Sequence, residues 1–391
     1  MQSFMPPKRT LMGPGPSDVS ERILNAMARP TLGHLDPDFQ HMMEEVKTGL
    51  KQLFRTENKL TFPVSAPGSA GMETCFLNLV DEGDTVIVVR HGVFGERMRE
   101  NVVRAGGTPV IVDVDWGKAP DLTAIEAALE ANPEAEILAF VHAETSTGVL
   151  ADAASICALA NKHGCLTIVD AVTSLGGVPV LMDEWGIDAI YSGSQKCLSC
   201  TPGLSPVSFS EKALEKVRSR KTPVRSWFLD LSLVMNYWEG EGGRSYHHTA
   251  PVNALYALHE ALVMISEEGL ENVWDRHAKM HRALAAGLES MGLEFLVDKD
   301  VRLPQLNAVV VPDGVDEASV RAHLLSAFDL EIGAGLGPMA GKVWRIGLMG
   351  SSASETNVEL CITALADALN KHQYPVNGGR ALAATKAALA E

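Results

Sequence analysis

Two residues that follow apolar, strand-like runs could do chemistry together. Asp170 ends the run Leu166–Val169, and Lys196 follows the small-residue stretch Ser192-Gly193-Ser194. Taken alone, a strand-terminal aspartate usually caps a helix and a loop lysine is usually solvated. Together they meet the needs of pyridoxal phosphate, because a lysine amine can form a Schiff base with its aldehyde and a buried carboxylate can keep its pyridine nitrogen protonated. The pair predicts a pyridoxal-phosphate site.

A second feature is the small-residue segment Ser65–Gly71 (SAPGSAG), which runs into an amphipathic stretch. Small residues before a helix let backbone N–H groups approach an anion, and the helix dipole favours negative charge there. The segment lacks the lysine of a P-loop and the spacing of a dinucleotide fingerprint. It is therefore either a phosphate-binding loop or an ordinary loop in which a serine caps the helix.

The elements that must position these residues follow an alternating pattern from residue 60 to about 210. Short apolar runs predict strands at Thr85–Val89, Pro109–Val114, Ile137–Val141, Leu166–Val169 and Ala189–Tyr191. Amphipathic stretches between them predict helices at Ser69–Leu79, Gly95–Ala105, Leu122–Ala131 and Ala151–His163. Such alternation predicts an α/β fold, a mainly parallel sheet covered by helices on both faces. Ligands of such sheets bind beyond the carboxyl ends of the strands, which is where Asp170 and Lys196 fall.

The pattern changes to α+β after two consecutive helices expected at Asn253–Gly269 and Leu270–Gly292. Further elements are expected at Asn307–Val311 (strand), Asp316–Ala327 (helix), Leu330–Ile332 (strand), Val343–Gly347 (strand) and Glu355–Leu369 (helix). We therefore predict an N-terminal arm (1–16), a large cofactor-binding domain (17–265), a small C-terminal domain (266–372) and a C-terminal tail (373–391). The tail is expected to be helical and peripheral.

Composition narrows the class of partner. The 391 residues include 33 Lys+Arg and 49 Asp+Glu, a formal net charge of −16, which argues against nucleic acid. No apolar run approaches the about 20 residues of a spanning helix. With six cysteines in a chain this long and no secretory signal in Met1–Arg9, we expect a reducing cytosol.

We expect no metal site. Cys197 and Cys200 have the spacing Cys-x-x-Cys without a second pair, so packing is the preferred interpretation. His277 and His281 share a helix face without an apparent third ligand, so we interpret them as a surface pair.

Seven blocks in order along the chain resemble the alanine–glyoxylate (serine–pyruvate) aminotransferases, class V members of the fold-type-I pyridoxal-phosphate enzymes. The blocks are Leu11–Ser17, Gly33–Pro37, His142–Gly148, Val169–Gly177, Tyr191–Lys196, Tyr246–Thr249 and Gly341–Gly347. The resemblance implies a large domain with a mainly parallel, seven-stranded type of sheet, a small C-terminal domain, and a homodimer with shared active sites. It also implies transamination from L-alanine or L-serine to a 2-oxo acid, expected to be glyoxylate, giving glycine and pyruvate or hydroxypyruvate.

The resemblance also implies a role at each matched position. Lys196 matches the Schiff-base lysine that moves the substrate proton, and Asp170 matches the partner of the pyridine nitrogen. Arg345 matches the residue that clamps the substrate carboxylate. The other cofactor-binding matches are Val172 and Phe94 on the ring faces, Thr145, the phosphate ligands Gly68, Ser69 and Gln195, and Tyr246 and Thr249, which the other subunit donates. Pro67 stands where many relatives have Ser or Thr, and we leave it out because it has neither an N–H nor a hydroxyl.

Several alternatives stay open. Within the class they are serine–glyoxylate, ureidoglycine–glyoxylate and pyridoxamine–pyruvate aminotransferases. A cysteine desulfurase is rejected, because no cysteine lies between residues 310 and 345 to act as the nucleophile. Outside the class, the chain could bind pyridoxal phosphate without transaminase activity, or it could be a doubly wound protein that binds another phosphate ligand such as a nucleotide.

Overall fold

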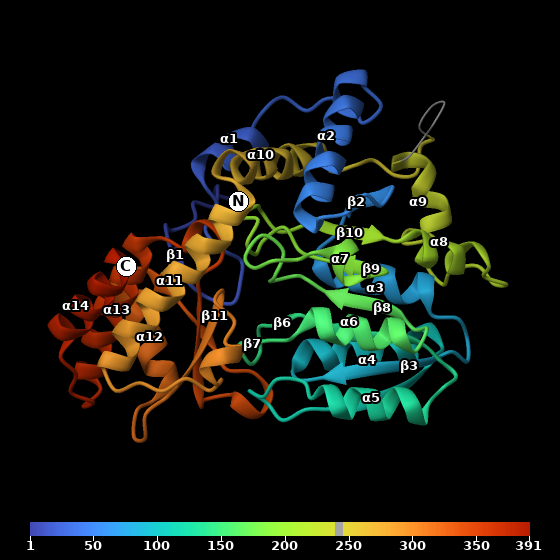
Figure 1. Cartoon of the computed structure of the whole chain (residues 1–391). Coiled ribbons are helices and arrows are strands. Elements are labelled where there is room, and N and C mark those ends of the chain that lie inside the picture. Colours follow the sequence, from blue (N-terminus) through green and yellow to red (C-terminus); the bar gives the residue numbers. More distant parts are fainter. Residues whose placement is uncertain (239–244) are drawn as a thin grey trace.

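A seven-stranded sheet forms the centre of the larger of two lobes (Figure 1). The computed structural model describes residues 1–238 and 245–391. In spatial order the strands are β2 (Leu60–Val64), β10 (Ser205–Phe209), β9 (Ala189–Tyr191), β8 (Leu166–Asp170), β5 (Ala135–Val141), β3 (Thr85–Arg90) and β4 (Thr108–Asp113). β10 runs antiparallel to both of its neighbours, whereas the pairs from β9 to β4 are parallel. The predicted mainly parallel α/β sheet is confirmed.

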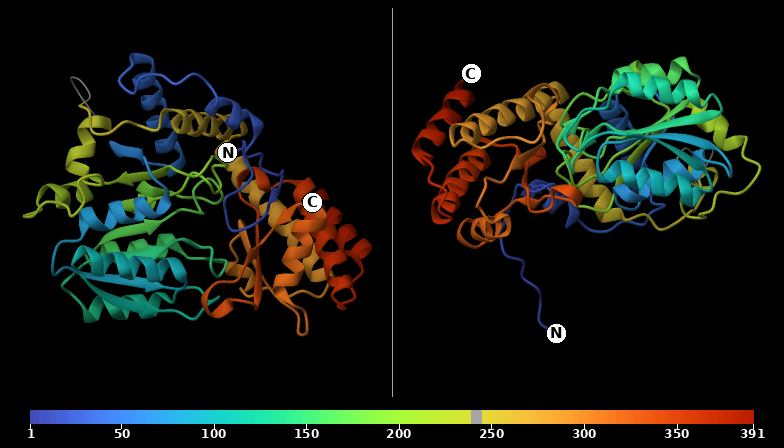
Figure 2. Two further views of the ribbon diagram at one scale, coloured as in Figure 1. Left: turned by 180° about the vertical axis from the view of Figure 1, so that it is seen from behind. Right: turned by 90° about the horizontal axis from the view of Figure 1, so that it is seen from below.

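Helices cover both faces of this sheet. α3 (Gly68–Leu79) and α4 (Val93–Ala105) lie on one face, and α5 (Leu122–Ala131) and α6 (Ala153–Lys162) lie on the other (Figures 1 and 2). The central strands are therefore buried on both sides, as their unbroken Val, Ile and Leu runs predict.

The sequence did not indicate β2 and β10, and both contain a proline. Pro63 and Pro206 stand opposite each other in the antiparallel pair. Proline cannot donate to a sheet ladder, so it weakens any strand prediction. Here β2 is an edge strand, and the carbonyl of Pro206 still accepts from the Ser192 N–H at 2.7 Å.

The remaining helices of the larger lobe pack around the sheet edge and its loops. They are α1 (Glu21–Met27), α2 (Pro37–Phe54), α7 (Met182–Trp185), α8 (Glu211–Arg218), α9 (Leu231–Trp238) and α10 (Val252–Glu268). One hydrophobic core joins these elements and extends from Ile23 to Leu262.

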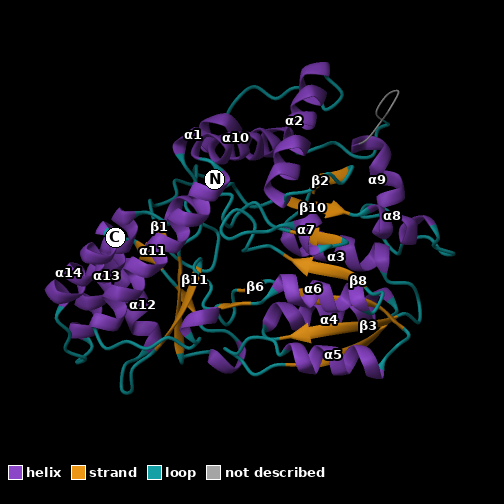
Figure 3. Ribbon diagram, viewed as in Figure 1, coloured by secondary structure: helices purple, strands orange, loops and turns teal. Residues whose placement is uncertain are grey.

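The smaller lobe has its own core, which includes Met12 and residues from Met280 to Leu389. Its antiparallel sheet has the order β11 (Leu306–Val310), β14 (Val343–Gly347) and β13 (Gly333–Ala334), as the orange strands of Figure 3 illustrate. Its helices are α11 (Leu270–Ser290), α12 (Glu317–Phe328), α13 (Glu355–Lys371) and α14 (Gly378–Ala390). The domain boundary at residue 265 falls within α10 and stays a prediction.

Both ends of the chain contribute to the smaller lobe. β1 (Thr10–Leu11) pairs in parallel with β12 (Leu330–Glu331), and Met12 is fully buried. The part of the arm before β1 extends away from both lobes (Figure 2). At the other end, α14 packs on α11 and α13 and buries Ala381, so the expectation of a peripheral tail is wrong. Among the described residues, no helix is long and apolar enough to cross a membrane.

Candidate active site

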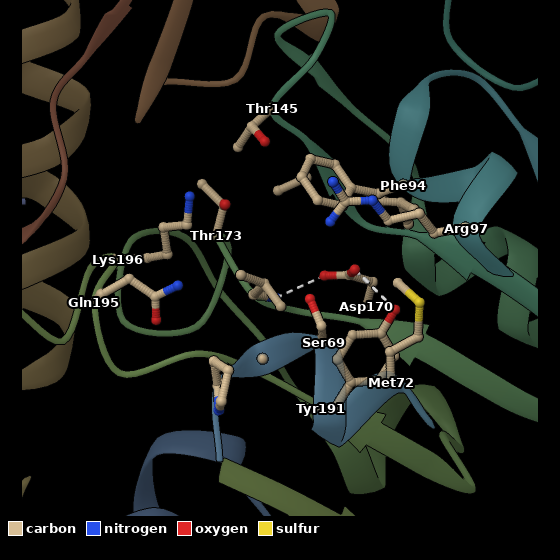
Figure 4. A pocket seen from close by; sticks show the side chains of 15 residues that line it. Ser69, Met72, Phe94, Arg97, Thr145, Asp170, Thr173, Tyr191, Gln195 and Lys196 are labelled. Carbon is tan, nitrogen blue, oxygen red and sulfur yellow. Dashed lines mark hydrogen bonds between the residues drawn. The ribbon is translucent and has the colours of Figure 1, made fainter. Parts of the chain in front are cut away.

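A cavity of about 190 Å³ opens at the carboxyl edge of the parallel strands (Figure 4). Eight of the predicted site residues line it: Gly68, Ser69, Phe94, Thr145, Asp170, Val172, Gln195 and Lys196. Lys196 and Gln195 lie on one side of the cavity, and Phe94 and Arg97 lie on the other (Figure 4). The loops that follow β2, β3, β5, β8 and β9 thus meet at one place, as expected at the carboxyl edge of such a sheet.

Asp170 is the last residue of β8, and its carboxylate is held from two sides. The N–H of Val172 donates to Oδ1 at 2.8 Å, and the hydroxyl of Tyr191 donates to Oδ2 at 2.8 Å. Burial raises the pKa of Asp170 to about 7, although both hydrogen bonds act in the opposite direction. A cation next to this carboxylate would favour its ionised form.

Lys196 lies in the loop after β9, and its side chain is buried. Burial lowers the pKa of its amine to about 8, and the positive charge of Arg345 contributes to this shift. The amine donates to the carbonyl of Pro14, in the segment that connects the smaller lobe to α1. A buried lysine with a lowered pKa has more of the neutral form that acts as a nucleophile.

The N-terminus of α3 supplies donors for an anion. Its N-cap residue is Pro67, which makes no side-chain capping hydrogen bond. The first N–H groups of a helix have no partner within the helix, so those that follow Pro67 suit a phosphate. Nearby, the Oε1 atom of Gln195 is buried without a hydrogen-bond partner in the described protein. A Cβ on Gly68 would stand 3.3 Å from Val172 Cγ2, so the glycine allows close packing at this point.

Phe94 projects from the first turn of α4. The guanidinium carbon of Arg97, one helical turn later, lies 4.8 Å from the centroid of the Phe94 ring. A cation over an aromatic ring is favourable, and it presents positive charge at the cavity wall.

Arg345 does not line the cavity directly, but it is tied to its wall. It projects from β14 of the smaller lobe and is buried. Its Nε donates to the carbonyl of Ala334 at 2.6 Å, and its Nη1 donates to the carbonyl of Thr145 at 3.2 Å. Burial lowers the pKa of its guanidinium to about 10, and the charge of Glu144 opposes this shift.

Tyr246 and Thr249 are not brought to the cavity within one chain. Tyr246 is 62 % exposed, and its hydroxyl lies 3.5 Å from the Thr249 hydroxyl. Their predicted phosphate role requires a second subunit, so it stays a prediction.

The sequence prediction missed several lining residues, including Tyr191 and Arg97; Pro67, which was left out as a phosphate ligand, also lines the cavity. The signal for Tyr191 was available, because parallel β8 and β9 place Asp170 and Tyr191 opposite each other. Arg97 could have been found from its helical spacing of three residues after Phe94.

The structure also corrects the interpretation of His277. Its side chain is fully buried in α11, so it is not part of a surface pair. Its Nε2 accepts from the Gly350 N–H at 2.9 Å, and burial lowers its pKa to about 4. His277 therefore connects α11 to the loop after β14 as a neutral side chain.

Comparisons with known proteins agree with this architecture. Residues 18–343 match the family described as aminotransferase class-V. The alanine–glyoxylate aminotransferase of Rattus norvegicus is 41% identical over 365 residues, which is 93% of this chain and 88% of the relative. The (S)-ureidoglycine–glyoxylate transaminase of Bacillus subtilis is 36% identical over 396 residues, covering 97% of this chain and 94% of that protein.

Solved structures are similar over the whole fold. The crystal structure of alanine–glyoxylate aminotransferase from Nostoc sp. has a TM-score of 0.92 at 44% identity, covering 94% of this chain and 97% of that one. The ureidoglycine–glyoxylate aminotransferase from Bacillus subtilis has a TM-score of 0.97 at 36% identity and covers both chains completely.

The fold is that of the fold-type-I aminotransferases. The chain belongs to the class V aminotransferases. It is an enzyme that transfers an amino group between an amino acid and a 2-oxo acid, and its class depends on pyridoxal phosphate.

Proposed function

We propose that this enzyme binds pyridoxal phosphate at Lys196 and transfers the amino group of L-alanine or L-serine to glyoxylate. The products are glycine and pyruvate or hydroxypyruvate. The observation that carries the proposal is that Asp170, Lys196 and the N-terminus of α3 open into one cavity whose wall is tied to Arg345. The alanine–glyoxylate relatives support the choice of substrates.

The residues present fit the cofactor. The uncapped N-terminus of α3 offers N–H donors to an anionic group, and Gln195, which lines the same cavity, carries an amide NH₂ that would add a further donor. Asp170 would face the pyridine nitrogen, and Phe94 and Val172 would contact the ring. When bound, pyridoxal phosphate supplies an electron sink for the bond broken at the substrate Cα.

The remaining chemistry belongs to the chain's own side chains. Lys196 would hold the cofactor through its Nζ. Once the amino group of the substrate has replaced it there, the freed amine would be the group that holds and moves the substrate Cα proton. Tyr191 and the Val172 N–H orient the Asp170 carboxylate, which would favour the protonated form of the ring nitrogen. Burial excludes water, which strengthens these charge interactions.

Arg345 is the proposed clamp for the substrate carboxylate. Two of its N–H donors are used by backbone carbonyls, which fixes the guanidinium plane and leaves further donors. The net charge of −16 does not attract anionic substrates, so local donors must capture them. We expect Arg345→Ala to raise the KM for both substrates about 10- to 100-fold in steady-state kinetics, from the loss of a charge-assisted pair. An unchanged KM would place the clamp elsewhere.

The donor is tested by a panel of L-alanine, L-serine, L-aspartate, (S)-ureidoglycine and pyridoxamine, with glyoxylate and pyruvate as acceptors. The highest kcat/KM should belong to alanine or serine with glyoxylate, and the Lys196→Ala variant should have no turnover. The second candidate is ureidoglycine as donor, favoured by the full-length similarity to the Bacillus subtilis enzyme. A purified protein without a cofactor band, or one that keeps activity as Lys196→Ala, would refute both candidates.

We further propose a cytosolic homodimer in which Tyr246 and Thr249 bind the cofactor phosphate of the other subunit. The cytosolic part is supported by six buried cysteines without a disulfide in the described chain. Mixing two inactive variants tests the shared site. In a dimer of one Lys196→Ala chain and one Thr249→Ala chain, one of the two sites would have both native residues, so activity should return. Failure of the mixed dimers to regain activity would contradict a site shared in this way.

A further inference from the structure

A buried carboxylate behind the cavity has not been assigned a role above. Glu144 ends the short strand β6 (Ala143–Glu144), which pairs with β7 (Val149–Leu150). Its side chain is fully buried, and its carboxyl oxygens accept hydrogen bonds from Phe94 and Ser146. A buried polar group that loses a hydrogen bond is costly, so each of these bonds matters for the surrounding structure.

The hydrogen bonds of Glu144 lead to the wall that carries Phe94. Its Oε2 accepts from the Phe94 N–H at 3.1 Å. Its Oε1 accepts from the N–H and the hydroxyl of Ser146 at 3.0 and 2.6 Å. The Ser146 hydroxyl in turn accepts from the Val93 N–H at 3.0 Å.

These contacts cap α4 from outside the helix. The N-cap residue of α4 is Gly92, which has no side chain to accept from the first N–H groups. A Cβ at Gly92 would stand 2.4 Å from both the Glu144 carboxyl carbon and the Ser146 hydroxyl. Because Gly92 has no side chain, the Glu144 carboxyl group, which comes from β6, can approach the positive N-terminal end of α4.

Glu144 also influences the two charged groups of the site electrostatically. Its negative charge acts on the pKa of Arg345 and of Asp170, raising each, although burial is the larger influence on both. The adjacent residue, Thr145, provides the carbonyl that accepts from Arg345. Two adjacent residues, Glu144 and Thr145, thus contact the start of α4, which carries Phe94, and Arg345, the proposed substrate clamp.

We propose that Glu144 is a positioning residue of the transamination site, which caps α4 so that Phe94 is held against the cofactor. This inference rests on the proposed binding of pyridoxal phosphate. Glu144 does not touch the reacting atoms, so its effect passes through Phe94.

The test is a double-substitution cycle on cofactor affinity. Glu144→Gln keeps the shape of the side chain but replaces one acceptor oxygen with an NH₂ donor, so one capping bond is lost. We expect the Kd of pyridoxal phosphate, measured by titrating the cofactor-free protein and following absorbance, to rise about 10-fold. Phe94→Leu alone should raise it similarly, and the double variant should bind no more weakly than Phe94→Leu, because the two residues act in series.

A matched control separates positioning from stability. Glu260 is another buried carboxylate, paired with Arg22 and Arg29 far along the chain. Glu260→Gln should lower the Tm while leaving the cofactor Kd unchanged. Ser146→Ala, which removes the cap of Val93, is the second variant if Glu144→Gln does not fold, and it should raise the Kd severalfold.

The outcomes are distinguishable. A native Kd in folded Glu144→Gln or in Ser146→Ala, or additive effects in the cycle, would overturn the role of Glu144 alone. A wild-type protein that binds no pyridoxal phosphate would instead refute the proposed function, and this inference with it.

Discussion

The amine of Lys196 is buried next to the positive charge of Arg345, and both influences favour its neutral form. We expect the rate at which cofactor-free protein attaches pyridoxal phosphate to rise with pH around a midpoint near 8, the pKa of this amine, rather than near 10.4 as for an exposed lysine. Rapid-mixing absorbance measurements between pH 6 and pH 10 test this expectation.

Two substitutions test whether the charge of Arg345 contributes to the lowered pKa of Lys196. Arg345→Met should move the midpoint to higher pH because a nearby positive charge is removed. Arg302→Met, which removes a guanidinium stacked on Phe295 in the smaller lobe, should leave it unchanged. A midpoint near 10 in the wild type would contradict the burial of the amine.

Burial also favours the neutral form of Asp170, but for a carboxyl group this raises the pKa instead of lowering it. Its pKa of about 7 lies above the ordinary value of about 3.9, so between these values the folded protein keeps a proton that the unfolded chain has lost. The free energy of unfolding of the cofactor-free protein should therefore fall as pH rises through this window, by roughly 2–4 kcal/mol from this group. Denaturant titrations at several pH values measure the slope.

Asp170→Asn should flatten that slope, and it should also abolish turnover. Bound cofactor should flatten the wild-type slope as well, because a protonated ring nitrogen stabilises the ionised carboxylate. Asp121→Asn, at an exposed helix cap, should keep the native slope. An unchanged slope in Asp170→Asn would mean that another group holds the proton.

At the scale of elements, the segment before α1 controls the position of Lys196. Gly15 has a φ of 105°, and a Cβ there would stand 2.5 Å from the Lys196 amine nitrogen and 2.7 Å from its Cδ. The next residues are also joined to this loop, since the Ser17 hydroxyl donates to the Lys196 carbonyl at 2.7 Å. The N-terminal segment therefore packs against the Lys196 side chain and its loop, a contact that neither the sheet nor its helices provide.

We expect Gly15→Ala to displace the Lys196 side chain and to slow cofactor attachment by at least 10-fold. Gly164→Ala is the matched control, because Gly164 also has a positive φ of 77° but nothing lies within 4 Å of a Cβ there. It should cost about 1 kcal/mol of stability from backbone strain without affecting attachment. Equal attachment rates in the two variants would contradict the contact between Gly15 and Lys196.

For the whole molecule, the close approach of α11 and α14 decides how the smaller lobe packs. A Cβ at Gly287 would stand 2.3 Å from Thr385 Oγ1 and 2.6 Å from Ile362 Cδ1. Gly287→Ala should lower the free energy of unfolding by about 1–3 kcal/mol through overpacking. Thermal and denaturant unfolding provide the measurement.

Gly379→Ala is the comparison variant, and here we expect the free energy of unfolding to rise instead of fall. Gly379 is exposed in the first turn of α14, and a Cβ there would make only an ordinary 3.5 Å contact with Asn377. It should raise stability by about 0.5–1 kcal/mol through helix propensity. If Gly287→Ala were as stable as Gly379→Ala, α14 would not pack on α11 as described.

The active site also depends on the docking of the two lobes. Thr145 comes from the larger lobe and Arg345 from the smaller one, and one hydrogen bond joins them. The N-terminal segment makes a second connection, because Met12 is buried in the smaller lobe while Pro14 accepts from Lys196. The proposed cofactor lysine and the proposed substrate clamp are therefore each held by contacts between the two lobes.

Local patterns in the sequence predicted the parallel sheet, which the structure confirms, and the pair Asp170 and Lys196, whose chemical role stays a prediction. Unbroken Val and Ile runs, such as Thr85–Arg90, and amphipathic helices are local patterns, so periodicity reveals them. Asp170 and Lys196 were singled out because Asp170 directly follows such a run and Lys196 lies in the loop after another, and parallel strands bring their carboxyl ends to one edge. The two proline-containing strands were not predicted, because a proline weakens the local signal for a strand; of the two, only β2 lies at the edge of the sheet.

The surroundings of that pair become visible only in the folded chain. Three contacts join residues far apart in the sequence. They are the hydrogen bond from Lys196 to Pro14, the hydrogen bond from the Phe94 N–H at the start of α4 to Glu144, and the packing of the Ala-rich tail on α11. No local period encodes such contacts, since they exist only after the two lobes have docked and each buried polar group has found its partner. The chemistry of the enzyme was visible in the sequence, whereas the protonation state and orientation of its groups depend on burial that only the folded chain provides.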